Sequence, residues 1–171
     1  MKNQNINTEN SNRKEVLEMN EFINDEAEAR ATMEEAIDNL VKYRMFCLEI
    51  VGDLQEENNC PEFLILNDIF CEIAEILSKI SMVHQASCNV SLEKLKSNNL
   101  FYAIKVDNKT LQKYLRFIIK YFNDVFASKI EDDYSTSKVL VLKLITSEML
   151  VITESIEKSY NLMADKIKEN G

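Results

Sequence analysis

The most regular hydrophobic pattern in this chain lies between Pro61 and His84. Apolar side chains recur there at steps of three and four residues, which is the period of one helix face. The main seam, which ends with a histidine, consists of Phe63, Leu66, Phe70, Ile73, Leu77, Ile80 and His84. A second seam beside it consists of Ile65, Ile69, Ile76 and Val83. Because a helix that is apolar on most sides must be covered on most sides, we predict that 61–84 is the central helix of a bundle.

The residues before this stretch predict a tail followed by one or two helices. Residues 1–11 are polar and show no hydrophobic period, so we expect them to be disordered. Asn12 and Glu15 have the spacing of a capping box. A helix beginning there would direct three apolar residues inward, namely Val16, Met19 and Ile23. A break at Asp25 would then start a second helix, and one uninterrupted helix over 12–57 is the alternative.

Three further helices are indicated by apolar seams. The helix at 25–57 has a seam of Ala36, Leu40, Tyr43, Cys47, Ile50 and Leu54. The helix at 107–130 has a core face of Leu111, Leu115, Ile118, Phe122 and Val125. The helix at 137–168 has a seam of Leu142, Ile145, Met149, Ile152, Ile156, Tyr160, Met163 and Ile167. Helices of this length joined by short loops pack as antiparallel neighbours.

The pattern is weaker between 84 and 107. Ser91 is placed to begin a short helix, and Asn98 with Asn99 predicts a turn. The apolar run 100–106 fits either a strand or a buried helix, and with no second strand to pair with we expect helix or an extended connector. Asp107 or Asn108 would cap the helix that follows.

Together these patterns predict an all-α fold: one domain over 12–171, built as an antiparallel up-and-down bundle of four to five helices around the central apolar helix 61–84. The chain has only two glycines and one proline among 171 residues. Sheets with tight turns and phosphate-binding loops need those residues, so both are disfavoured.

Composition predicts a cytoplasmic protein. The N-terminus has no apolar run of a signal peptide, and no window is apolar enough to span a membrane. The four cysteines show no paired spacing, and we expect them to be reduced thiols without a disulfide or metal role.

The net charge of −9 is unevenly distributed. Residues 1–62 carry six basic and fifteen acidic side chains, whereas 94–130 carry eight basic and two acidic ones. Four cations with helical spacing form a basic stripe, namely Lys109, Lys113, Arg116 and Lys120, and Tyr114, Phe117 and Tyr121 lie nearby. Basic residues interleaved with aromatics can bind a nucleic-acid backbone. The low arginine content and the acidic total disfavour nucleic acid, so we favour an acidic protein partner or internal pairing with the acidic segment 15–38 over it, with a plain solvated face as the alternative.

One pattern of carboxylates suggests chemistry. Sixteen residues separate the pair Glu15 and Glu18 from the pair Glu35 and Asp38. This Glu-x-x-Glu and Glu-x-x-Asp pattern resembles that of the all-α nucleotide pyrophosphatases of the MazG and dimeric dUTPase group. The resemblance covers about 24 residues and implies Mg²⁺ held between two adjacent helices, with the metal binding substrate phosphates.

The leading interpretation is a non-catalytic bundle that binds another protein, with a homodimer as one form of this, through the basic stripe. The rival is a Mg²⁺-dependent nucleotide pyrophosphatase. His84, the single histidine, is interpreted as a structural helix-end residue, since it has no partners for a histidine metal site. Nothing in the sequence resembles a nucleophile elbow or a Cys–His pair.

Overall fold

The computed structural model describes residues 4–58, 61–90, 100–126 and 133–169, with side chains described at 26–56, 61–90, 100, 102–124 and 136–165. The described chain is almost entirely helical and contains no strand, so the predicted all-α class is confirmed. Its elements are α1 (Gln4–Asn58), α2 (Glu62–Cys88), α4 (Leu100–Tyr121), a π-helical turn η1 (Phe122–Phe126) and α5 (Asp133–Glu169).

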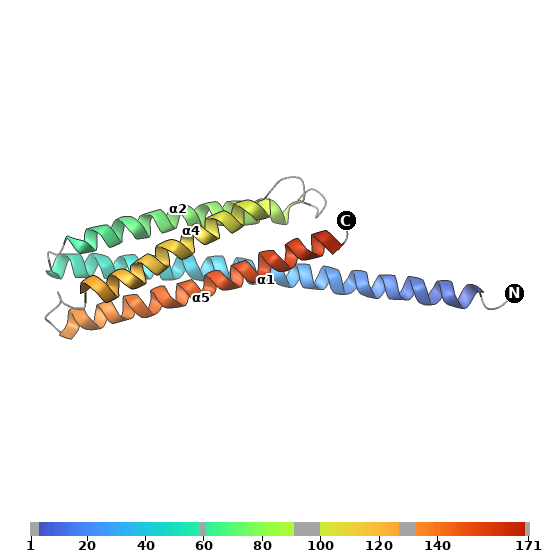
Figure 1. Cartoon of the computed structure of the whole chain (residues 1–171), viewed down its shortest axis with the longest axis horizontal. Coiled ribbons are helices and arrows are strands. Elements are labelled where there is room, and N and C mark those ends of the chain that lie inside the picture. Colours follow the sequence, from blue (N-terminus) through green and yellow to red (C-terminus); the bar gives the residue numbers. More distant parts are fainter. Residues whose placement is uncertain (1–3, 59–60, 91–99, 127–132, 170–171) are drawn as a thin grey trace.

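The helices form a ring of antiparallel neighbours (Figure 1). α1 packs against α2, α2 against α4, α4 against α5, and α5 closes the ring on α1. The described helices therefore form an antiparallel bundle, as predicted. None of them is long and apolar enough, over the residues described, to cross a lipid bilayer.

The prediction that 61–84 is the central helix is not confirmed. α2 is one of four helices around a shared core, and its outer face meets solvent. Ile65, from its second apolar seam, is 48% exposed, and Met82 is 68% exposed. In a four-membered ring each helix has two neighbours, so only part of its circumference is covered however apolar the remainder is.

All four helices contribute to one buried core. The main seam of α2 lies inside it, and Phe70 and Ile73 are fully buried as predicted. The other helices contribute the fully buried residues Met33, Leu40, Leu54, Leu111, Leu115, Ile118, Leu142, Met149 and Ile156. Some seam positions are less covered than predicted: Ile145 and Ile152 are half-buried, and Tyr43 is exposed.

α1 is a single helix of 55 residues, about 80 Å long at the α-helical rise. Of the two alternatives for 12–57, the uninterrupted helix is therefore the one observed. Residues 4–11 are part of α1, and the expected disorder of 1–11 stays a prediction. No proline occurs before Pro61 and no glycine before Gly52, so nothing in this segment strongly opposes helix. The N-terminal part of α1 extends past the other helices (Figure 1).

Residues 100–106 are helical, which places the start of α4 earlier than predicted. Neither Asp107 nor Asn108 caps a helix, because both lie within α4. Asn108 is buried and donates from Nδ2 to the Thr153 carbonyl of α5 at 3.0 Å. The neighbouring helix thus supplies a partner for Nδ2, whereas the buried Asn108 Oδ1 has no partner among the described residues.

Two arginines of α1 attach it to α2. Arg30 Nη1 donates to the Ser87 carbonyl at 2.8 Å, and Arg44 Nε donates to the Phe70 carbonyl at 3.0 Å. The two arginines are four helical turns apart and so lie on the same face of α1. Charged donors to carbonyls form the stronger class of hydrogen bond, and they help to set the register of the two helices.

We predict that Phe70→Ala lowers the free energy of unfolding by about 3–5 kcal/mol, the range for a buried aromatic truncated in a tight core. Chemical denaturation measures this change. Leu64→Ala on the same helix is the matched control, because Leu64 is half-exposed and its truncation should cost less than about 1 kcal/mol. A loss under about 1 kcal/mol for Phe70→Ala would contradict its place in the core.

We predict that Gly52→Ala raises the free energy of unfolding by about 0.5–1 kcal/mol. Gly52 lies inside α1, and an added Cβ would have no heavy atom within 4 Å, so the gain in helix propensity carries no steric cost. Gly52→Val should gain less, because branching at Cβ restricts the side chain in a helix. Thermal or chemical denaturation measures the stability of the two variants. A less stable Gly52→Ala would contradict the open space around position 52.

Candidate binding groove between α2 and α4

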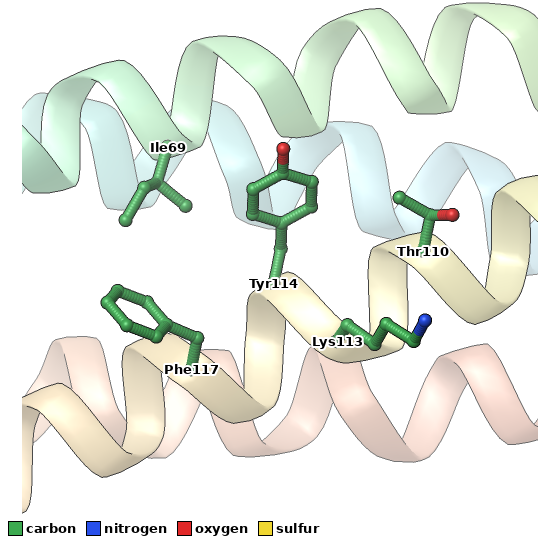
Figure 2. A pocket seen from close by; sticks show the side chains of 5 residues that line it. All are labelled: Ile69, Thr110, Lys113, Tyr114 and Phe117. Carbon is green, nitrogen blue, oxygen red and sulfur yellow. The ribbon is translucent and has the colours of Figure 1, made fainter.

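A hollow of the surface lies between α2 and α4 and has a volume of about 440 Å³. Its lining, here called the α2–α4 groove, consists of Ile69, Thr110, Lys113, Tyr114 and Phe117. Ile69 comes from α2 and the other four from α4 (Figure 2). Ile69 points from α2 towards α4, and Tyr114 points from α4 towards α2. Phe117 lies on α4, below Ile69 in the view. The lining is therefore largely apolar, with one cation at its rim.

Local sequence explains this arrangement. Thr110, Tyr114, Phe117 and Tyr121 follow one another at steps of three and four, so they share one flank of α4. The rings of Phe117 and Tyr121 stack with their centroids 5.7 Å apart. The Phe117 side chain is still 49% exposed despite this stacking. Burying its exposed part against a ligand would be favourable. An exposed aromatic beside an apolar hollow is typical of interaction sites.

The basic stripe borders this groove. Its residues Lys109, Lys113, Arg116 and Lys120 are all exposed, and they lie opposite the buried Leu111, Leu115 and Ile118. Lys113 belongs to both the stripe and the groove. Among the described residues none of the four cations has an acidic partner within ion-pair distance. Lys105, one turn upstream, is instead placed over the Tyr160 ring at 5.8 Å.

Internal pairing of the stripe with the acidic segment 15–38 is not observed where the structure describes both sides. α4 packs against α2 and α5, whereas the acidic segment belongs to α1 across the ring. Glu34 and Glu35 are themselves exposed on α1. The side chains of 15–25 lie outside the described residues.

The carboxylate pairs of the pyrophosphatase resemblance do not share a site within the chain. Glu15, Glu18, Glu35 and Asp38 all lie on the continuous helix α1. The two pairs are twenty residues apart, which is roughly 30 Å along one helix, whereas the resemblance requires two adjacent helices. Over the described residues, no group of three or more histidine, cysteine or acidic side chains could hold a metal ion.

His84 has a neighbour that the sequence analysis missed. Cys88 Sγ lies 3.7 Å from His84 Nε2, one turn along α2. The expectation of no Cys–His pair is therefore wrong; the i, i+4 spacing on a helix was the available signal. His84 is 4% exposed, and this burial lowers the pKa of its imidazole. Glu34 acts in the opposite direction and raises that pKa, while Arg30 adds to the lowering.

The sequence analysis identified only the α4 side of the groove. Sequence reasoning placed Tyr114 and Phe117 near the stripe, but it expected Ile69 to be covered by another helix. The described ring has no further helix over Ile69, which therefore forms the α2 wall of the groove.

No family model, curated protein or solved structure matches this chain.

The three cysteines whose side chains are described are free thiols, and they differ in environment. Cys47 is buried in the core, whereas Cys71 and Cys88 are exposed on α2. Burial raises the pKa of the Cys47 thiol to about 12, and a side-chain hydrogen bond with Thr146 only partly offsets this shift. Cys60 lies outside the described residues.

We predict that Cys47 resists alkylation in the native protein at pH 8, because the thiolate is the reactive form and burial suppresses it. Cys71 and Cys88 should react with iodoacetamide under the same conditions. In the denatured, non-reduced protein, thiol titration should find four free thiols. Peptide mass spectrometry assigns each site. Alkylation of Cys47 as fast as Cys71, or a titre of two thiols, would contradict these assignments.

Proposed function

We propose that this protein is a non-catalytic binding module that docks an acidic amphipathic helix of a partner protein in the α2–α4 groove. The observation that carries the proposal is an apolar hollow bordered by four exposed cations that lack acidic partners among the described residues. Such a surface offers apolar burial and charge pairing side by side, as helix-in-groove recognition requires.

The size of the stripe suits a helical ligand. Lys109 and Lys120 are eleven residues apart, which is roughly 17 Å or three helical turns. A ligand helix with acids at steps of three and four would present them along the same length, with its apolar face towards Ile69 and Phe117. The aromatic residues would supply most of the affinity and the cations most of the association rate and orientation.

The chemistry favours a protein ligand over nucleic acid. Three of the four cations are lysines, which cannot make the paired hydrogen bonds that arginine makes to phosphates. The chain as a whole carries a net charge of −9, so a long polyanion would be repelled outside the stripe. A short acidic helix interacts mainly with its immediate surroundings, because salt screens charges more than about 10 Å away.

We expect the charge reversal Lys113→Glu with Arg116→Glu to slow association with the partner strongly, and more so at low salt, where screening is weakest. Its effect on folding should be small, since exposed charges contribute about 0–1 kcal/mol each. The matched control reverses Lys42 and Lys158, which are exposed on α1 and α5 and give the same change in net charge. Denaturation curves verify that both variants are folded.

The measurement compares proteins captured from the native cell by the wild type, the two charge variants and a groove variant, Phe117→Ser. Leu144→Ser is the apolar control, because Leu144 is exposed on α5. A protein that binds the groove should be captured by the two controls, the Lys42 and Lys158 reversal and Leu144→Ser. It should be lost from the Lys113 and Arg116 reversal and from Phe117→Ser. Self-association lost in the same pattern, measured by sedimentation, would identify a second copy as the partner. Capture that is identical for all variants would leave the stripe as a solvated face and overturn the proposal.

A further inference from the structure

The end of α2 carries a thiol–imidazole pair that the binding function does not use. Cys88 Sγ and His84 Nε2 are 3.7 Å apart, within the distance of a sulfur–nitrogen hydrogen bond. The two groups differ in accessibility, because Cys88 is exposed while His84 is 4% exposed. A reagent in solution can therefore reach the sulfur, while the imidazole that contacts it is shielded from water.

Hydrogen bonds to the α2 backbone hold the helix end that carries His84 and Cys88. Ser87 Oγ donates to the His84 carbonyl at 2.6 Å, and Arg30 Nη1 of α1 donates to the Ser87 carbonyl at 2.8 Å. Arg30 is itself held by Glu26, with 2.7 Å between Nη2 and Oε1. These contacts fix the last turns of α2, which carry both His84 and Cys88, against α1.

One ring nitrogen of the buried imidazole lacks a hydrogen-bond partner. His84 Nδ1 is buried and has no hydrogen-bond partner among the described residues. Leaving a buried polar atom without a partner costs about 1–3 kcal/mol. The ring's hydrogen-bond contact in the described structure is the Cys88 thiol at its other nitrogen. A buried polar atom without a partner requires an explanation, and a chemical role of the side chain is one.

The charge state of the ring suits a proton acceptor. Among the described residues, two charged side chains of α1 act on His84: Glu34 favours the protonated imidazole, and Arg30, paired with Glu26, opposes it. Burial has the largest effect and lowers the pKa of His84 below its ordinary value of 6.5. At neutral pH the imidazole is therefore uncharged, and a lone pair is available for the thiol proton.

We propose that Cys88 is a reactive thiol, with His84 as its general base, which forms a mixed disulfide with low-molecular-weight disulfides. The thiol transfers its proton to His84 Nε2 as its sulfur attacks one sulfur of the disulfide. The S–S bond of the reagent breaks, and the leaving thiolate takes the proton back from His84. The products are the Cys88 mixed disulfide and one free thiol, so that the reagent is reduced and Cys88 is oxidised.

The chain contains its own control for this reaction. Cys71 is also exposed and also on α2, but the residues four positions away from it are Asn67 and Glu75 rather than histidine. The probe is 2-hydroxyethyl disulfide, which is uncharged and therefore insensitive to the uneven charge of the surface. Mass spectrometry of peptides from the full chain follows the modification of Cys88 and Cys71 in the same sample.

At pH 7 Cys88 should react at least about a hundredfold faster than Cys71, the lower end of what a positioned base contributes. His84→Gln should reduce the Cys88 rate to that of Cys71 and leave Cys71 unchanged. Circular dichroism checks that this variant is folded. Equal rates in the wild type, or a fast Cys88 in folded His84→Gln, would overturn the proposal.

The pH profile of the wild type tests the proposal without any substitution. A thiol without a base loses roughly tenfold in rate per pH unit below its pKa, because only the thiolate reacts. Between pH 7.5 and 6.5 the rate of Cys88 should stay nearly constant until His84 becomes protonated at lower pH, whereas the rate of Cys71, which has no adjacent base, should fall over the same range. Parallel profiles for the two cysteines would overturn the proposal even if His84→Gln failed to fold.

Discussion

The interlocking of apolar side chains from α1, α2, α4 and α5 in one core is the interaction on which the other features depend. Phe63 and Phe70 of α2 are fully buried there, together with leucines from all three other helices. No single helix pair could exclude water from these residues, because each helix needs two neighbours to cover its seam. The ring therefore assembles as a unit, and the outward faces of the helices are left with whatever residues the core does not need.

Two outward regions have acquired a distinct chemistry. On α4, the basic stripe lies beside apolar groove residues that remain accessible. At the end of α2, an exposed thiol contacts a buried imidazole. Ile69 and His84 are fifteen residues apart on α2, which is roughly 22 Å. The two regions are thus far enough apart that a substitution in one leaves the other in place, and their tests are independent.

Polar contacts within the bundle set its register. Asn108 and Thr153 join α4 to α5, and Arg30 and Arg44 join α1 to α2 through backbone carbonyls. A hydrogen bond of this kind contributes about 0.5–1.5 kcal/mol net, less than one buried leucine or phenylalanine, but it has directional requirements that apolar packing lacks. The hydrogen bond from Arg30 to the Ser87 carbonyl also holds the end of α2 that carries His84 and Cys88.

Hydrophobic period alone was sufficient to predict the all-α class, the antiparallel arrangement and most of the core, including Phe70, Ile73 and the inward face of α4. These features follow from local spacing, because side chains three or four residues apart share a helix face whatever surrounds the helix. The exposure of the basic stripe followed from the same argument, since cations opposite a buried seam face solvent.

Tertiary structure decided which apolar residues are covered. The second seam of α2 looked equally buried in the sequence, but coverage depends on how many helices surround it, and the ring leaves Ile65 exposed and Ile69 only half-buried. The carboxylate pairs on α1 looked convergent only on the assumption of a break that the helix does not have. Asn108 looked like a helix cap, yet it lies inside α4 because Thr153 on another helix supplies its partner. In each case the deciding neighbour is distant in the sequence, and a local pattern contains no information about it.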